Sequence, residues 1–238
     1  MNLPPQRFGE TRDALHRLAA YVISPAREQV TGRIGLRALG GQFGTPPFGD
    51  DEVVVAVGGA DLVRRDVRGE DRRAITTLAE GAAWLGVEID PTRADRFDVP
   101  PAGDVAAKLA VDERASSWLV DWYDLAADVL EGLRAGFTAA EGATETQLWP
   151  EHFDIAMSGG DEQAGQRANF GASPGDAAIA EPYFYVGPWS SDGLGDGFFP
   201  NGSFASLRLS EIGDQDARAT TLGFLRRGRD VLRNRSPI

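Results

Sequence analysis

The spacing of apolar residues predicts a long helix in the middle of the chain. From Glu113 to Leu133, apolar side chains recur every three or four residues, which is the period of an amphipathic helix, and Gly136 follows as a stop. The same spacing over fewer turns predicts helices at residues 11–22, 75–85 and about 214–232. These four segments form the expected helical part of the fold.

Short apolar runs and alternating patterns predict strands in both halves of the chain. Residues 52–66 are typical of a hairpin, because the β-branched run at 53–57 is followed by a glycine-containing turn and a second apolar segment. Several stretches within residues 148–189, and the stretch 204–209, alternate apolar with polar side chains. The glycine-rich residues 32–49 fit a strand that runs into a loop.

The order of these elements predicts an α+β fold. Strands cluster instead of alternating with helices, so we expect a mostly antiparallel sheet, curved or in two layers, covered by the long central helix and the terminal helices. A doubly wound α/β fold is the alternative. We expect a single domain over residues 1–238, and the proline-rich segment 91–102 is the best candidate for an internal boundary.

Composition excludes several kinds of chemistry. The chain has 238 residues and no cysteine, which rules out disulfides, thiolate metal sites and a cysteine nucleophile. The net charge of −12 disfavours nucleic acid as a partner, because a negative field repels phosphates. The sequence shows neither a signal peptide nor an apolar stretch of membrane-spanning length, so we expect a soluble, cytoplasmic protein without a membrane partner. A homo-oligomer is among the assemblies that the sequence allows.

Aromatic and polar residues gather between positions 148 and 189, which hold two of the five Trp and two of the four Tyr. Alternate residues of a strand share a face. The polar face would carry one pair of residues from each of three strands: His152 and Asp154, Arg167 and Asn169, and Tyr183 and Tyr185. Such a mixed lining is typical of a ligand pocket. The alternative is the solvated side of a half-exposed antiparallel sheet.

We therefore predict a small-molecule site here, for an uncharged or cationic ligand, with no cofactor identified and no metal. His152 is the candidate acid–base residue, and Asp154 is the candidate carboxylate partner. Asp154 lies about 6.5–7 Å away along a strand, so Asp176 or Glu181 are alternative partners. The expected ligand-binding residues are Trp149, Arg167, Asn169, Asp176, Glu181, Tyr183, Tyr185 and Trp189. The competing interpretation of His152 is that its ring hydrogen-bonds a buried backbone group.

Two sharper chemistries fail on the residues present. The run Gly171–Gly175 has the letters of a serine nucleophile elbow, but Pro174 follows Ser173 and has no N–H for an oxyanion, so a turn is expected. A metal site with two histidines would have to recruit His16 from the N-terminal helix, and we do not favour it. Whether the protein is an enzyme stays open. The second function hypothesis is a structural or protein-interaction module whose aromatic strands form an interface.

Three motifs in this region resemble a known pattern. LWPEHFDIA, NFGASPGD and EPYFYVGPW are similar to the C-terminal half of an uncharacterised bacterial family with Trp-Pro-x-His-Phe-Asp, Asn-aromatic-Gly-x-Ser-x-Gly-Asp and Glu-Pro-Tyr-aromatic-Tyr-Val motifs. The resemblance is limited to about residues 146–190 and implies no reaction. It implies that the following residues belong to one pattern: Trp149, His152, Asp154, Asn169, Ser173, Asp176, Glu181, Tyr183 and Tyr185.

Overall fold

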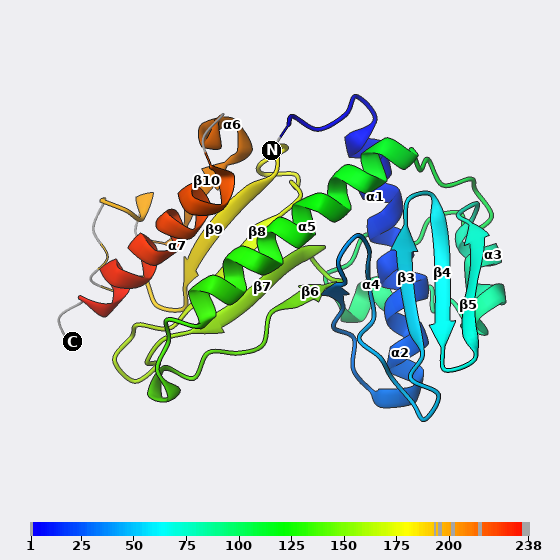
Figure 1. Ribbon diagram of the computed structural model, residues 1–238, viewed down its shortest axis with the longest axis horizontal. Helices are drawn as coiled ribbons and strands as arrows, with labels where there is room; N and C mark the ends of the chain where they lie inside the picture. The colour runs from blue at the N-terminus through cyan, green and yellow to red at the C-terminus, as the bar shows by residue number, and fades with distance from the viewer. Residues whose placement is uncertain (1, 193, 195–196, 201–202, 214–215, 235–238) are drawn as a thin grey trace. The chain divides into compact units, whose positions relative to one another are not determined.

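Two antiparallel sheets of five strands each form the β part of the chain in the described residues (Figure 1). The structure is a computed structural model that describes residues 2–192, 194, 197–200, 203–213 and 216–234. Helices flank the sheets, and the longest, α5 (Glu113–Arg134), matches the predicted central helix. The α+β expectation with antiparallel strands is confirmed.

Contacts along the backbone divide the chain into two compact units. The N-terminal unit consists of Pro4–Asp124 and Leu148–Phe153, and the C-terminal unit consists of Met1–Leu3, Leu125–Gln147 and Asp154–Ile238. The division therefore falls inside α5, inside the strand at 147–149 and between Phe153 and Asp154, away from the proline-rich segment 91–102. The single-domain expectation stays a prediction.

Short helices, a five-stranded antiparallel sheet and the first half of α5 make up the N-terminal unit. Its elements in chain order are α1 (Phe8–Leu18), the π-helix η1 (Ala19–Ile23), α2 (Ser24–Thr31), β1 (Arg37–Ala38), β2 (Phe43–Gly44), β3 (Val54–Gly58), β4 (Asp61–Asp66), β5 (Gly69–Ala74), α3 (Leu78–Leu85) and α4 (Arg93–Arg96). The predicted hairpin at 52–66 is β3 and β4, which pair antiparallel. Helix α3 begins where Thr77 accepts a hydrogen bond from the Glu80 N–H and ends at Gly86, whose φ of 69° favours glycine.

The C-terminal unit holds the strands in which the sequence predicts a site. Its elements are the second half of α5, η2 (Ala139–Glu141), β7 (Asp154–Gly159), β8 (Ala168–Ser173), β9 (Tyr183–Pro188), β10 (Ala205–Arg208), α6 (Leu209–Ile212) and α7 (Ala217–Arg233). The strand order of this sheet is β10-β9-β8-β7-β6, with β6 at Gln147–Trp149. Helix α7 begins at its N-cap Asp216, and the start predicted at residue 214 lies outside the described residues.

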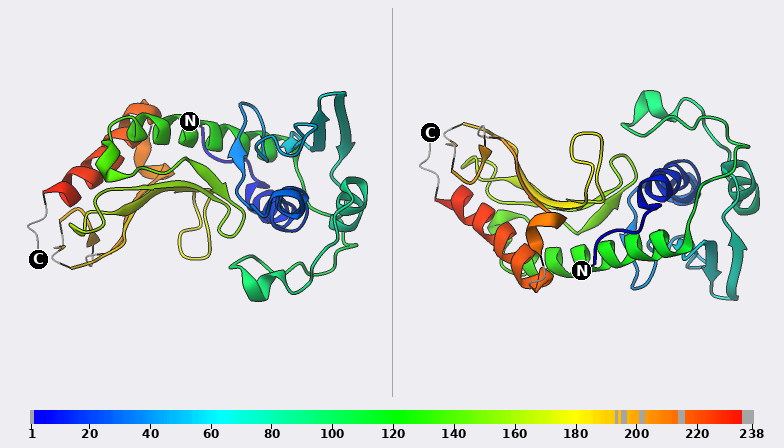
Figure 2. Two further views of the ribbon diagram at one scale, coloured as in Figure 1. Left: turned by 90° about the horizontal axis from the view of Figure 1, so that it is seen from below. Right: turned by 90° about the horizontal axis from the view of Figure 1, so that it is seen from above.

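One face of this sheet is apolar because alternate strand residues point the same way. Phe170, Ala172, Phe184 and Val186 share that face and are buried. Helix α7 packs on this side, where Val186 approaches Gly228, and Phe137 after α5 packs edge-on against Phe170. Figure 2 shows α7 and the second half of α5 on the same side of the strands. The opposite face is called the open face below.

None of the helices in the described residues combines the length and the apolar character that a membrane crossing requires.

Candidate functional site

The open face carries polar and aromatic side chains at strand positions that lie directly opposite one another. In the observed register, Gly171 of β8 lies between Ala156 of β7 and Tyr185 of β9, and Ser173 lies opposite Tyr183. The residues of the open face that matter here are Asp154, Asn169, Gly171, Ser173, Tyr183, Tyr185, Gly187 and Trp189. The sequence predicted these tyrosines, Asp154 and Asn169 on one face, and they lie on it.

Tyr185 and Asp154 form the first of two tyrosine–carboxylate pairs. The phenol of Tyr185 donates a hydrogen bond to Oδ2 of Asp154, two strands away. The ring passes over Gly171, where a Cβ atom would lie 2.5 Å from Cζ of Tyr185. Burial, and then the charge of Asp154, raise the pKa of Tyr185 well above its usual value. The phenol is therefore a neutral donor at physiological pH.

Tyr183 and Asp176 form the second pair. The Tyr183 hydroxyl donates to Oδ2 of Asp176 over 2.5 Å, and Oδ1 of the same carboxylate accepts the backbone N–H groups of Ala178 and Ile179. These bonds order the loop between β8 and β9 and place its carboxylate above the sheet. The pKa of Tyr183 is raised above its usual value, mainly by burial and secondly by the hydrogen bond to Asp176.

Aromatic rings continue along the same face. Phe204 stacks on Tyr185 with ring centroids 5.6 Å apart and meets Tyr183 edge-on at 6.2 Å. The two tyrosine rings are themselves 6.2 Å apart. Phe204 is 38% exposed, so the face reaches solvent at this ring, whereas Tyr183 and Asp154 are each only 7% exposed.

Trp189 lies beyond the end of β9 and is held by three contacts although it is 53% exposed. Its indole N–H donates to Oδ1 of Asn169 over 2.9 Å, and its backbone N–H donates to the carbonyl of Arg167 over 2.9 Å. The guanidinium carbon of Arg167 lies 4.9 Å from the centre of the indole ring. An exposed ring is thus fixed in one orientation.

Two of the predicted ligand-binding residues use their polar groups to hold the fold. Glu181 accepts the backbone N–H and the hydroxyl of Ser210, 3.0 Å each, at the first turn of α6. Arg167 donates to the hydroxyl of Ser158 and to the carbonyls of Gly142 and Gly160. Arg167 reaches the open face through its stacking on Trp189.

His152 does not lie on the strand with Asp154, so the predicted alternation from residue 151 is wrong at its start. Strand β7 begins at Asp154, and Phe153 before it has a φ of 55°, which turns the backbone out of the extended conformation. His152 and Trp149 belong to the N-terminal unit. The His152 side chain is 62% exposed and its Nδ1 lies 3.6 Å from Oδ2 of Asp98, which is 88% exposed. The pairing of His152 with Asp154 as acid and base stays a prediction.

The more buried histidine is His16, which sequence reasoning passed over. Its Nε2 lies 3.0 Å from the carbonyl oxygen of Pro150 and 3.1 Å from that of Glu151, so it must carry the proton and donate. Its ring stacks on Phe153 at 4.9 Å. Burial lowers the pKa of His16 below its usual value. Its position beside the apolar stripe of α1 gave no signal of this role.

Ser173 is a turn residue, as its neighbours predicted. It ends β8 and its hydroxyl accepts the N–H of Gly175 over 3.2 Å. The φ of 97° at Gly175 favours glycine in this turn.

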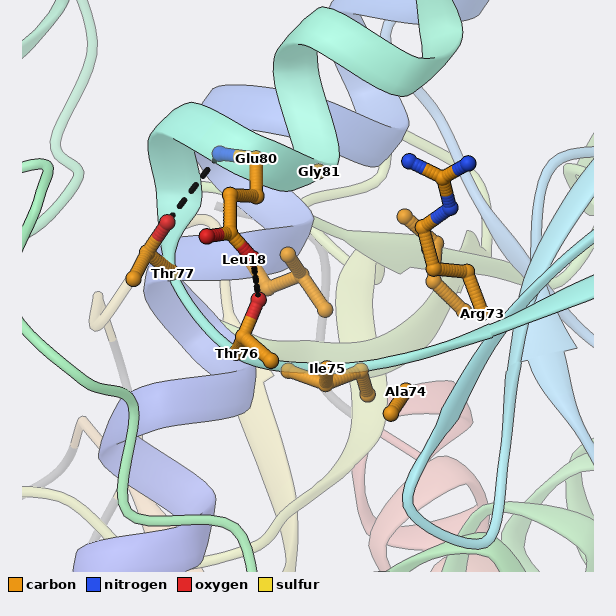
Figure 3. A pocket seen from close by; sticks show the side chains of 9 residues that line it. Leu18, Arg73, Ala74, Ile75, Thr76, Thr77, Glu80 and Gly81 are labelled. Atoms are coloured by element: carbon orange, nitrogen blue, oxygen red, sulfur yellow. Dashed lines mark hydrogen bonds between the residues drawn. The ribbon is translucent and has the colours of Figure 1, made fainter.

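A small cavity lies elsewhere, in the N-terminal unit (Figure 3). Leu18, Leu62 and Ile75 line it, and Glu80 at its wall is bonded to Thr76 and Thr77. It has room for about one water molecule. Its lining shares no residue with the site that the sequence predicts.

Comparison with known proteins adds no relative, since no family model, no curated protein and no solved structure matches this chain.

Proposed function

We propose that this protein binds a small, uncharged or cationic molecule on the open face of the sheet in its C-terminal unit. The observation that carries the proposal is the pair of adjacent tyrosine–carboxylate contacts, Tyr185 with Asp154 and Tyr183 with Asp176, beside the partly exposed ring of Phe204. Aromatic walls with a few ordered polar groups are the usual lining of small-molecule sites.

The charge of the ligand follows from which atoms the face offers. Both phenols donate their hydrogen to a carboxylate, so the phenol oxygen lone pairs and the exposed carboxylate of Asp176 are acceptors, whereas the carboxylate of Asp154 is buried. Acceptors suit a ligand that donates hydrogen bonds. The net charge of −12 further disfavours an anion. We propose binding alone, without a chemical step. We further propose that the protein is cytoplasmic and has no nucleic-acid or membrane partner.

A protein-interaction surface is the second candidate, and one observation favours it. Trp189 and Phe204 are both large, exposed and on the same face of the sheet. Exposed aromatic side chains that gather on one face are common where another protein docks. Such a partner, including a second copy of this chain, would protect both rings from solvent.

Native mass spectrometry of the purified protein, together with metal analysis, tests the proposal. We expect a bound small molecule that is retained by the wild type and lost from the Tyr185→Phe variant. Tyr21→Phe is the matched control, because the Tyr21 hydroxyl bonds the Pro100 carbonyl in the N-terminal unit and should leave retention unchanged. Equal retention by both variants would refute the site, and a mass equal to a dimer or a protein complex that hides Trp189 would favour the interaction surface.

A further inference from the structure

Gly187 is a strand glycine that the packing of the described residues around it does not explain. It lies inside β9, and its φ is not in the positive range that favours glycine. Other glycines of this sheet are covered: a Cβ at Gly171 would meet Tyr185 at 2.5 Å, and one at Gly159 would meet Phe137 at 2.9 Å. A Cβ at Gly187 would have Cδ2 of Phe204 as its nearest described atom outside the neighbouring residues, 4.0 Å away. A glycine inside a strand weakens it and often marks a place where a ligand comes close to the backbone.

Four side chains surround this bare stretch of strand. Asn169 is its direct partner on β8, and Phe204 continues the register of β10 to the position opposite it. Tyr185 and Trp189 are two residues away on either side along the strand, each about 6.5–7 Å from Gly187. The glycine is therefore a floor with Phe204, Tyr185 and Trp189 as aromatic walls.

The orientation of Asn169 defines which hydrogen bond a ligand would receive. The indole N–H of Trp189 is a donor only, so the amide oxygen of Asn169 must face it, as the 2.9 Å contact shows. The amide NH2 of Asn169 consequently points away from Trp189, and the side chain is exposed. A ligand over Gly187 would need a hydrogen-bond acceptor to receive a bond from this NH2 group.

The protein itself already places a cation against the indole ring of Trp189. The guanidinium of Arg167 lies 4.9 Å from the centre of the indole ring and supplies the cation that this π face attracts. A second cation on the same ring would meet like charge. A flat, uncharged ring has no such cost and stacks on aromatic side chains.

We infer that Gly187 is the floor of a subsite for an uncharged heteroaromatic ring that carries a hydrogen-bond acceptor on its edge. The ring would lie over Gly187, against Phe204 and Trp189, and accept a hydrogen bond from Asn169. The inference rests on the proposed function and names the ligand class that the open face takes.

Nuclear magnetic resonance titration of the isotope-labelled chain with nicotinamide and with adenosine tests the subsite. We expect at least one of these probes to shift both the Gly187 amide and the Trp189 indole signal. In Gly187→Val the same probe should bind at least tenfold more weakly while the melting temperature stays equal or rises, because the side chain fills open space. If Gly187→Val does not fold, Gly187→Ala is used in its place.

Gly223→Ala is the matched control. Gly223 lies on α7, and outside its own stretch of helix no described atom comes within 4 Å of the position that a Cβ would take. The change should therefore raise the melting temperature and leave probe binding unchanged. The subsite is overturned if neither probe shifts those two signals, or if Gly187→Val binds as the wild type does. Methyl glucoside is added as a saccharide, and binding of that ring alone at Gly187 would overturn the aromatic class.

The failures of the two proposals differ. If the probes fail to bind at Gly187 but a co-purified ligand is still lost from Tyr185→Phe, the proposed binding function stands. Only the heteroaromatic ring as the ligand class is then refuted. Absence of both a probe shift and a Tyr185-dependent ligand would remove both.

Discussion

The phenol of Tyr185 crosses a whole strand to reach the carboxylate of Asp154. The two residues lie on β9 and β7, and the strand between them presents only the backbone of Gly171 at the crossing point. A buried carboxylate that is 7% exposed thereby keeps a donor, and a large phenol lies flat on the sheet. The glycine, the tyrosine and the aspartate form one unit whose parts depend on one another.

Gly171→Ala should break this unit. The added Cβ would lie 2.5–2.7 Å from Cζ, Oη and Cε1 of Tyr185, so the ring must swing away from Asp154. We expect a loss of about 1–3 kcal/mol in the free energy of unfolding, measured by urea denaturation. The same substitution at Gly223 is the control and should stabilise helix α7 by about 1 kcal/mol. A Gly171→Ala protein as stable as the wild type would show that Tyr185 does not lie where the structure has it.

Alkaline pH should destabilise the protein through its raised tyrosine pKa values. Tyr183 and Tyr185 have pKa values above the usual value of about 10, so the folded protein holds protons that the unfolded chain releases. Their contribution to stability is complete below pH 10 and decreases as pH rises from there toward the folded pKa values. Urea unfolding between pH 8 and pH 11 should show this decline, and it should be shallower in the Tyr183→Phe, Tyr185→Phe double variant. An unchanged slope would contradict the pairing. Tyr21, whose pKa burial also raises, should leave a residual slope.

The two histidines should differ in their effect on stability. His152→Ala should change the free energy of unfolding by less than about 0.5 kcal/mol, because that side chain is exposed. His16→Ala should cost about 1–3 kcal/mol, since it removes a ring stacked on Phe153 and the donor to two carbonyls. The pKa of His16 is lowered, so its contribution is complete above pH 6.5 and is lost as pH falls below it. Thermal melts at pH 7.5 and pH 5.5 would show this, and a larger cost at His152 would refute it.

Glu141 should protect the C-terminal unit against acid. Its carboxylate receives two hydrogen bonds from Arg233, 2.6 and 2.8 Å, and others from Thr138, and the bond from Arg233 is the main cause that lowers its pKa to about 2. A lowered pKa gives stability that is present above pH 4.5 and lost as pH falls toward 2. Glu141→Gln should cost about 1–2 kcal/mol at pH 7 after solvent screening, and little at pH 2.5. Urea unfolding at both pH values checks this, and an equal cost at both would mean that charge is not involved.

The sequence predicted elements whose apolar pattern repeats. The central helix, the hairpin at 52–66 and the strand at 204–209 were all found, because each buries one regular face. Strand β5 was missed, since all six of its residues are exposed and carry no apolar alternation. The first helical segment continues beyond its predicted end at Val22 as η1 and α2, through the buried residues of η1 and past Pro25.

The site was predicted in part. Alternation along β8 and β9 placed Asn169, Tyr183 and Tyr185 on one face, because a regular strand has a fixed period. The same rule failed at His152, because the positive φ of Phe153 interrupts the extended backbone and β7 begins only after it, and no local pattern signals that angle. Contacts between distant segments, such as His16 with the carbonyls of Pro150 and Glu151, depend on the folded backbone and leave no trace in spacing.

A crystal structure of the protein with its co-purified ligand is the most direct test of whether the open face is the binding site. We predict ligand density over Gly187 and beside the Tyr185 ring, within hydrogen-bonding distance of the Tyr185 phenol or the Asn169 amide. Ligand density confined to another surface, with Tyr185 and Trp189 in contact only with water, would show that the open face is not the binding site.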